Sequence, residues 1–225
     1  FFHQLEEYFA EVLHKPFYIA LADEEAVQYL GLDPKEYEVE EQVDLKDYLY
    51  DGEAMRTLAG KKLHKKKNHL NAFMREYEGR YEYRRLCCSD RHEVWEFMER
   101  WRQKKADADA LEDSLEYEVA GIHEILKNCS SLSVRMAAVY VDGQMEAFTI
   151  GSLNERENMA VIHIEKANPD IKGLYQFINQ QFLVHEFPDV ALVNREDDVG
   201  MEGLRKAKMS YNPIGFARKY MVRKR

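Results

Sequence analysis

The chain has 225 residues, of which 45% are hydrophobic and 32% are charged, and its formal net charge is −9. This length can hold one large domain or two small ones, and the hydrophobic fraction is sufficient for an ordinary core. The acidic balance argues against a protein that coats nucleic acid along its length, although a local basic patch can still bind it.

The three cysteines have neither the spacing of a disulfide framework nor the spacing of a zinc site. Two of them are adjacent, Cys87 and Cys88, and the third is Cys129. We therefore expect reduced thiols in a cytoplasmic protein and no metal site. The sequence contains no signal peptide and no apolar run of membrane-spanning length.

The beginning of the chain alternates between helix and strand patterns. Residues 2–13 have the apolar spacing of a helix, and residues 16–21 are typical of a strand. Asp23 can cap a short helix that Gly31 stops. Residues 37–43 then alternate as an exposed strand, so the order is helix, strand, helix, strand.

Residues 51–77 predict one long helix with a strongly basic middle. Too many lysines gather there for one helical face. One interpretation is a solvated linker helix. The other is a site for the phosphates of a cofactor, a lipid headgroup or tRNA, because a bound anion relieves the repulsion among clustered cations. The cluster consists of Lys61, Lys62, Lys65, Lys66 and Lys67, and Asn68 and His69 follow it.

The middle of the chain predicts a strand and two helices. Residues 81–87 are typical of a strand, and Asp90 with Glu93 can form a capping box for a helix that ends near residue 102. A second helix is expected over residues 111–126, with its apolar side chains on one face.

A hairpin and a third strand follow. Residues 137–141 and 145–150 are apolar and flank Asp142-Gly143, which is a strong hairpin-turn signal. Residues 159–164 predict a third strand.

The next segment predicts a parallel βαβ unit. After residue 170 the apolar period changes from two to about three and a half, which indicates a helix that ends near residue 186. Residues 189–194 then form a short apolar strand. A strand, a crossover helix and a second strand should make a right-handed parallel unit, whose functional end lies where the first strand meets the helix, at residues 165–175.

The end of the chain repeats the order seen at its beginning. A helix is predicted over residues 201–208 and a strand over residues 214–222. Together with the preceding helix and strand, these give helix, strand, helix, strand again. We therefore expect two related units, of which the first lacks its opening strands.

The element order from residue 81 onward resembles the GNAT acyltransferase fold, and three local sequences narrow the resemblance. They are residues 60–69, residues 163–176, and residues 194–208 with Tyr211 and Pro213. Together they are similar to the bacterial family that resembles the C-terminal domain of phosphatidylglycerol lysyltransferase, and the resemblance covers nearly the whole chain.

The resemblance implies a tandem GNAT-like α/β (α+β) architecture with mixed sheets flanked by helices. Residues 1–78 would form an N-terminal unit that is incomplete at its start, with residues 51–77 as a bridging basic helix. Residues 79–225 would form the C-terminal unit. The implied chemistry is transfer of an acyl group from a coenzyme A thioester or an aminoacyl-tRNA to an amine or hydroxyl acceptor, including a lipid headgroup, although some relatives have no known activity.

Gly173 is the expected centre of the donor site. In the GNAT pattern, an Arg/Gln-x-x-Gly-x-Gly/Ala loop before the helix binds a pyrophosphate through backbone amides, and this chain has a single glycine at that place. Gly173 can let the backbone approach an anion, or it can serve only the geometry of the helix start. This departure from the pattern leaves a phosphate-bearing donor other than coenzyme A open. The expected donor-binding residues are Lys172, Gly173, Leu174, Tyr175, Lys62, Lys65 and Lys66.

Glu165 is the best-placed general base for an acceptor amine, because it stands at the end of the third strand. Strand alternation predicts that His163 and Glu165 share one face and that Lys166 points to the other. The alternative is that Glu165 is a salt-bridge partner, for example of Lys172.

Polar residues after the last strand of the βαβ unit should reach the same end of the sheet. They can bind substrate, or Asp197 and Asp198 can cap the next helix. Tyr211 is a candidate general acid, as tyrosine is in many GNAT enzymes. The expected substrate-binding residues are His163, Asn194, Arg195, Glu196, Asp197, Lys206 and Lys208.

Two classes of function therefore remain. The first is an acyltransferase or aminoacyltransferase, and the second is a non-catalytic GNAT-like module that binds a phosphorylated ligand or a protein partner. The sequence has no Ser/His/Asp or Cys/His arrangement and no Walker loop that would favour another chemistry. It identifies neither the donor nor the acceptor.

Overall fold

The computed structural model describes the backbone of residues 1–106 and 112–225 and the side chains of residues 1–103 and 116–225. The chain forms two compact units, one of residues 1–49 and 196–225 and the other of residues 50–195. We call them the first and the second unit. The expected start of a helix at Leu111 lies outside the described residues.

The predicted boundary near residue 79 does not separate these compact units. Helix α4 (His64–Glu76), which precedes residue 79, packs on α7 (Leu174–Glu186), which follows it. Strand β4 (Tyr81–Leu86), just after residue 79, pairs along its whole length with β5 (Val134–Val141). Segments on both sides of residue 79 therefore share one core. The division into two GNAT-like units stays a prediction.

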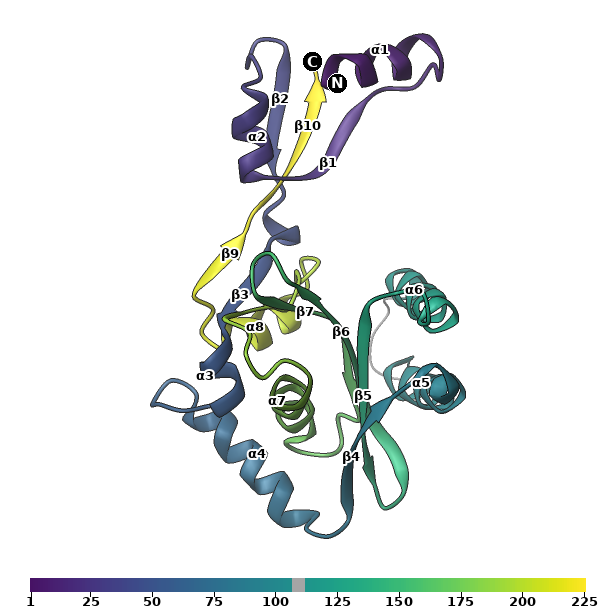
Figure 1. The fold of residues 1–225 in the computed structure, drawn as a ribbon, viewed down its shortest axis with the longest axis vertical. Helices are drawn as coiled ribbons and strands as arrows, with labels where there is room; N and C mark the ends of the chain where they lie inside the picture. Colours follow the sequence, from purple (N-terminus) through teal and green to yellow (C-terminus); the bar gives the residue numbers. More distant parts are fainter. Residues whose placement is uncertain (107–111) are drawn as a thin grey trace. The chain divides into compact units, whose positions relative to one another are not determined.

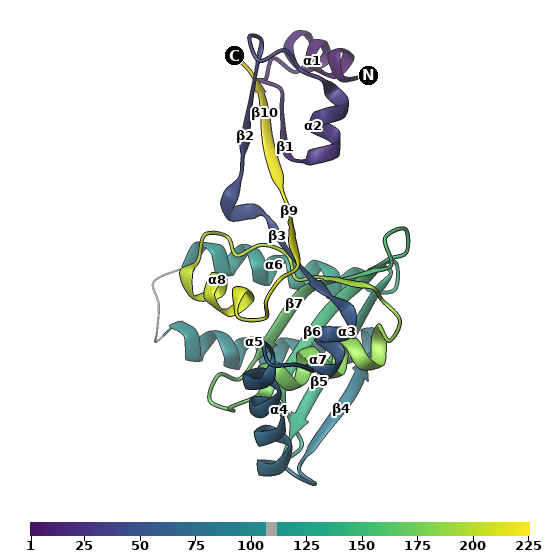
Figure 2. The same cartoon turned by 90° about the vertical axis from the view of Figure 1, so that its left-hand side faces the viewer.

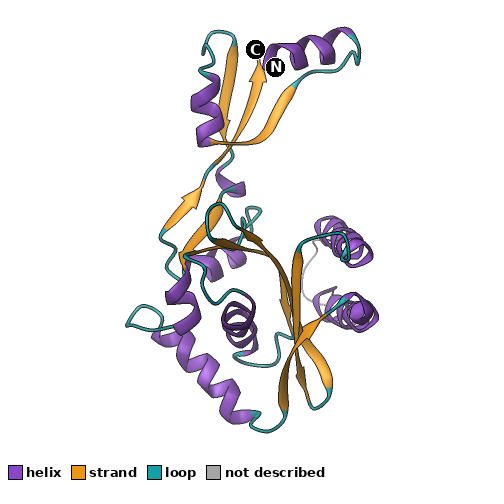
Figure 3. Ribbon diagram, in the orientation of Figure 1, coloured by secondary structure: helices purple, strands orange, loops and turns teal. Residues whose placement is uncertain are grey.

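The second unit contains a sheet with the strand order β4-β5-β6-β7-β8 (Figure 3). Its other strands are β6 (Gln144–Asn154), β7 (Met159–Ala167) and β8 (Leu192–Asn194). Neighbours from β4 to β7 are antiparallel, whereas β7 and β8 are parallel. The predicted parallel βαβ unit is thereby confirmed.

The predicted hairpin is also confirmed. Asp142 and Gly143 join β5 to β6 with φ angles of 51° and 82°. Two consecutive residues with positive φ form the turn type that matches the twist of a hairpin, which explains the Asp-Gly pair.

Helices cover both faces of this sheet (Figures 1 and 2). Helices α5 (Arg91–Ala106) and α6 (Glu112–Asn128) lie on one face, and α7 lies on the other. The core under α5 and α6 is continuous and apolar. It includes Val94, Phe97, Met98, Trp101, Ile122, Leu126, Phe148 and Ile150.

The expected helix over residues 51–77 is two helices, α3 (Gly52–Thr57) and α4. Leu58 ends α3 with a left-handed φ of 48°, and a helix cannot continue through that conformation. Lys61 and Lys62 consequently lie between the two helices. The periodicity alone could not reveal this break, because Leu58 is a good helix former and is buried here.

The helix start near residue 90 differs by one turn from the prediction. Asp90 accepts a hydrogen bond from the Cys87 N–H at 2.7 Å, so the capping box consists of Cys87 and Asp90. The short helix η2 (Cys88–Asp90) therefore precedes α5.

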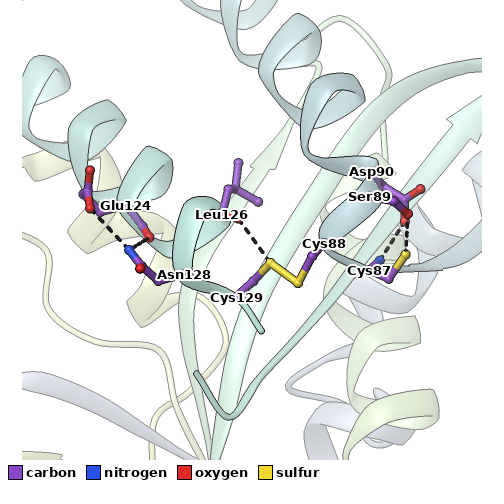
Figure 4. The surroundings of a disulfide bond; sticks show 8 residues. All are labelled: Cys87, Cys88, Ser89, Asp90, Glu124, Leu126, Asn128 and Cys129. Atoms are coloured by element: carbon purple, nitrogen blue, oxygen red, sulfur yellow. Dashed lines mark hydrogen bonds between the residues drawn. A yellow bond between two sulfur atoms is a disulfide. The ribbon is translucent and has the colours of Figure 1, made fainter. Parts of the chain in front are cut away.

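The expectation of three reduced thiols is wrong for two of the cysteines. Cys88 and Cys129 form a disulfide with a Cα–Cα distance of 5.9 Å, and Cys87 is a free, exposed thiol (Figure 4). The two half-cystines are 41 residues apart in sequence, and the packing of α6 beside α5 brings them together. Sequence spacing could not predict that contact.

The first unit contains a small antiparallel sheet with the order β1-β10-β2, whose strands are β1 (Tyr18–Asp23), β2 (Tyr37–Glu41) and β10 (Lys219–Lys224). Two helices, α1 (Phe2–Glu11) and α2 (Glu24–Leu30), precede and follow β1. The predicted cap is confirmed, because the Asp23 carboxylate accepts a hydrogen bond from the Ala26 N–H at 2.6 Å.

The predicted strand over residues 214–222 is two strands. Strand β9 (Gly215–Ala217) pairs with residues 47–49 of β3 (Asp47–Asp51), and β10 joins the small sheet. The rest of this unit comprises η1 (Val43–Leu45) and α8 (Glu202–Met209).

Candidate functional site

The parallel strands β7 and β8 pair at three positions, after which β8 ends. Their last paired positions are Val161 and Asn194, whereas β7 continues to Ala167. A bulge also interrupts β7, because the pairs Ile150–Ile164 and Gly151–Ile162 are consecutive and leave His163 as the extra residue. Bulges often re-aim side chains beside functional sites.

This bulge changes the expected arrangement of His163 and Glu165. His163 Nε2 lies 2.8 Å from the Ser152 hydroxyl oxygen on β6. Glu165, in contrast, contacts Asn179 on α7. The simple alternation that predicted a shared face fails because the extra residue shifts the register of β7 by one.

Glu165 is the centre of a nearly buried polar cluster. Its Oε1 accepts a hydrogen bond from Arg195 Nη2 at 2.8 Å, and its Oε2 accepts one from Asn179 Nδ2 at 2.7 Å. The side chains of Arg195 and Glu165 are only 13% and 9% exposed. Glu165 therefore has Arg195 as a salt-bridge partner, whereas Lys172, the partner that the sequence suggested, is exposed. Its catalytic role stays a prediction.

Asn179 is a member of this cluster that the sequence analysis missed. It is 2% exposed, and its Oδ1 accepts no hydrogen bond from the part of the chain whose side chains are described. One signal was present in the sequence, since an amide that lies next to the apolar residues Phe177 and Ile178 of a helix needs a polar partner if it is buried with them.

Lys66 belongs to the same neighbourhood. It is half-buried on α4, and burial together with the nearby positive charge of Arg195 lowers the pKa of its ammonium group. Glu165 and Arg195 thus form an ion pair near the end of β7, and the charge of Arg195 acts on the Lys66 ammonium group. Lys62 and Lys65 are exposed, so the lysine cluster contributes one half-buried cation to this place.

Gly173 has a packing role that the sequence analysis did not foresee. Its φ is +87°, and an added Cβ would lie 2.2 Å from the backbone oxygen of His69 and 3.0 Å from the Phe73 Cβ. Gly173 is the N-cap of α7 and lets α4 approach the start of that helix. Of its neighbours, Lys172 is exposed and Leu174 is buried.

Tyr175 lies in the first turn of α7 and interacts with Ala167 at the end of β7 and with Trp101 of α5. Burial raises the pKa of its phenol, and hydrogen bonding to Ala167 and Trp101 opposes that rise. Trp101 Nε1 also donates to the Ala167 carbonyl oxygen at 3.1 Å. Lys166 lies over the Trp101 ring, 4.5 Å from its centroid, and pairs with Glu118 of α6 at 2.7 Å.

The remaining predicted residues divide between the units. Asn194 ends β8 and is buried in the second unit. Glu196, Asp197, Lys206, Lys208 and Tyr211 belong to the first unit.

Within the first unit, Lys208 has a structural role. Its ammonium group is buried and donates hydrogen bonds to the backbone oxygens of Glu196 and Asp197. Lys206 is exposed and Tyr211 is buried.

Asp198 is the strongest buried acid of the first unit. Arg205 donates hydrogen bonds from Nε and Nη2, each at 2.9 Å, and the Tyr48 hydroxyl donates another. These donors, Arg205 foremost, lower the pKa of Asp198 to about 2. Burial and the same contact raise the pKa of Tyr48 to about 12. The predicted capping role is wrong, because α8 begins after Met201 without a side-chain cap, and the Gly200 N–H, which donates to Asp198 Oδ1 at 2.9 Å, belongs to the turn before that helix.

The described residues include no group of three or more His, Cys, Asp or Glu side chains that could hold a metal ion. None of the helices in the same described ranges is both long and apolar enough to cross a membrane.

Comparison with known proteins places this chain in a family. The family model described as "Phosphatidylglycerol lysyltransferase, C-terminal" matches residues 1–223. A crystal structure of a conserved protein of unknown function from Bacteroides thetaiotaomicron is 28% identical, with a TM-score of 0.90, and the match covers 100% of this chain and 75% of that one.

More distant structures share the fold. The C-terminal domain of a putative lysylphosphatidylglycerol synthetase from Agrobacterium fabrum is 15% identical, with a TM-score of 0.70, over 98% of this chain and 71% of that one. L-PGS from Bacillus licheniformis is 14% identical, with a TM-score of 0.67 and the same coverage. These matches confirm the expected class of mixed α/β sheets flanked by helices.

An uncharacterised protein of Mycoplasmoides gallisepticum is 29% identical over 178 residues, which are 79% of this chain. The chain spans only 56% of the length of that relative. Because the family model matches nearly every residue, the chain belongs to the family of phosphatidylglycerol lysyltransferase C-terminal domains.

Proposed function

We propose that the second unit is the donor-binding part of an acyltransferase or aminoacyltransferase. The observation that carries the proposal is the pair of Glu165 and Arg195 near the end of β7, together with Lys66, on which the charge of Arg195 acts. The open end of a parallel strand pair is a common place for ligands in α/β proteins. A nearly buried arginine and a half-buried lysine close to a single carboxylate favour an anionic ligand there.

The donor would be a coenzyme A thioester or an aminoacyl-tRNA, both of which carry phosphates. Arg195 and Lys66 would bind phosphate oxygens, with Arg195 presenting its planar donors in a fixed direction. An amine or hydroxyl of the acceptor would then attack the donor carbonyl, and the thiolate or the tRNA hydroxyl would leave. The family name and the named relatives make a lipid headgroup a candidate acceptor.

For Glu165 we favour a positioning role over general-base catalysis. Both of its oxygens already accept hydrogen bonds, one from Arg195 and the other from Asn179. A carboxylate with two such donors orients the arginine. If this is correct, Glu165→Gln weakens donor binding, because the charge that holds Arg195 is lost. A general base would instead spare binding and lower the turnover rate.

The same hydrogen bonds favour the second candidate function, a module that binds a phosphorylated ligand without catalysis. Such a module would need the cations and the orienting carboxylate but no proton acceptor. It would bind coenzyme A or tRNA and leave the acyl group in place.

A thermal-shift screen tests the proposal. The protein is heated with coenzyme A, acetyl-coenzyme A, uncharged tRNA and aminoacyl-tRNA in separate samples. A ligand at a hundred times its Kd should stabilise the protein by about 2.7 kcal/mol. Arg195→Gln should abolish the shift, whereas Arg156→Gln, which changes an exposed arginine of the β6–β7 turn, should preserve it. Absence of any shift, or an equal loss in both variants, would contradict the proposal.

A further inference from the structure

The disulfide between Cys88 and Cys129 joins two elements of the second unit that cover the same face of the sheet (Figure 4). Cys88 stands in η2 at the start of α5, and Cys129 follows the last turn of α6. The bond therefore fastens the end of α6 to the start of α5. Both helices also pack in a shared apolar core.

The two sulfur atoms differ in accessibility. Cys88 is partly exposed, whereas Cys129 is only 8% exposed. A thiolate from solution can therefore approach Cys88 more easily, and the sulfur of Cys129 would be the leaving group. This asymmetry gives thiol–disulfide exchange a direction.

The surroundings also accommodate the reduced form. Cys129 Sγ lies 3.1 Å from the backbone oxygen of Leu126, and Figure 4 draws this contact. A disulfide sulfur has no proton to donate, but the thiol that reduction creates does. The Cys129 thiol would thus have a hydrogen-bond acceptor without any movement of the helix.

Contacts along both helices connect this bond with the end of β7. Glu118 of α6 pairs with Lys166 at 2.7 Å, and Trp101 of α5 donates to the Ala167 carbonyl oxygen. Lys166 also stacks over the Trp101 ring. The pair of helices therefore fixes the two residues that follow Glu165, and a change in how α6 is held should reach that strand end.

We propose that Cys88 and Cys129 are a reversible redox site, which accepts electrons from a small-molecule or protein dithiol and sets how firmly α6 is held on the second unit. In the oxidised form the bond restrains α6. In the reduced form that restraint is absent, while packing and the pair between Glu118 and Lys166 still hold the helix. In a reducing compartment the dithiol form would predominate.

The chemistry balances as a two-electron exchange. One thiolate of the dithiol attacks Cys88 Sγ, the bond to Cys129 breaks, and Cys129 leaves as a thiolate that takes a proton. The second thiolate of the dithiol then attacks the dithiol's first sulfur atom, which is bonded to Cys88 in the mixed disulfide. This step releases Cys88 as a thiolate, which is also protonated. The dithiol becomes a disulfide, and the protein gains two electrons and two protons.

The test begins with Cys87→Ser, which removes the exposed neighbouring thiol and leaves only the proposed pair. The protein is equilibrated over a series of ratios of reduced to oxidised dithiothreitol. Free thiols are trapped with iodoacetamide and counted by intact mass. We expect a reversible two-electron transition between no trapped thiol and two trapped thiols. Two trapped thiols at every ratio would overturn the proposal, as would a bond that cannot be reduced without unfolding.

Hydrogen–deuterium exchange tests the effect on α6. We expect amides of residues 118–128 to exchange about tenfold faster in the reduced protein, while amides of α7 keep their rate. The variant Cys129→Ser should exchange like the reduced protein under both conditions. If α6 exchanges equally in both redox forms of the Cys87→Ser protein, the bond does not restrain the helix and the proposal fails. Neither the thiol trapping nor the hydrogen–deuterium exchange uses an acyl donor. The results of both are therefore independent of the proposed transferase function.

Discussion

The sequence correctly predicted that a glycine is needed at position 173, but the structure gives an additional reason for it. The sequence indicated a special glycine before α7, and its φ of +87° agrees with that expectation. The two reasons considered were room for an anion and the geometry of the helix start, and neither included the packing that the structure shows: the space that a Cβ would take is filled by the backbone of His69. The contact is between residues distant in sequence, so no local pattern could predict it.

We expect Gly173→Ala to lower the free energy of unfolding by about 3 kcal/mol, because the new methyl group overlaps a backbone oxygen and the positive φ is unfavourable. Gly60→Ala is a matched control, since Gly60 has the same φ of +87° and no atom lies within 4 Å of the place that its Cβ would take. That variant should lose only about 1 kcal/mol. Equal losses in urea denaturation would contradict the packing role.

Asp198 gives a prediction for acid stability. Its folded-state pKa of about 2 lies below the ordinary value of 3.8, so the ionised form stabilises the fold. The stabilisation is fully present above pH 4 or so and disappears as the pH falls through about 2. From the size of the shift, Asp198→Asn should lower the free energy of unfolding by about 2 kcal/mol at neutral pH and by much less in strong acid.

Asp44→Asn is the control for this prediction. Asp44 also accepts a hydrogen bond from Arg205, at 2.6 Å, but its side chain is 62% exposed. Exposed pairs contribute little, so we expect a loss below about 1 kcal/mol. Urea denaturation at several pH values checks both variants, and a pH-independent loss for Asp198→Asn would contradict the assignment.

At the scale of the elements, the sequence predicted those that local signals define. The Asp-Gly hairpin, the Asp23 cap and the parallel strands around α7 all have such signals, and all are confirmed. The elements that it missed depend on distant partners. Strand β3 is short and pairs with β9, and the bulge at His163 appears only when β6 and β7 are aligned.

Trp101 gives the test at this scale, because it joins α5 to the end of β7. Trp101→Phe removes the donor to the buried Ala167 carbonyl oxygen, which lies at 3.1 Å, and reduces packing. We expect a loss of about 1–3 kcal/mol in the free energy of unfolding. Trp95→Phe, on the same helix but 36% exposed, should change it by less than about 0.5 kcal/mol. Similar losses would show that the contact with Ala167 is unimportant.

At the scale of the whole molecule, the sequence predicted the family and the fold class but not the grouping of the site residues. Glu165, Arg195 and Lys66 come from three distant segments, and the structure brings them together in the second unit. Asp197 and Lys208, which the sequence grouped with Arg195, belong to the first unit.

The central claim is that Lys66 and Arg195 form an anion site, and the salt dependence of binding tests it most directly. Coenzyme A and unfractionated tRNA are titrated separately by calorimetry at salt concentrations from roughly 50 to 200 mM. Lys66→Gln is compared with Lys67→Gln, which removes the same charge from an exposed position of α4. We expect Lys66→Gln to weaken binding about tenfold and to reduce the slope of log K against log salt by about one for tRNA, while Lys67→Gln changes both much less. Equal effects of the two variants, or no binding of either ligand to the unmodified protein, would contradict the claim.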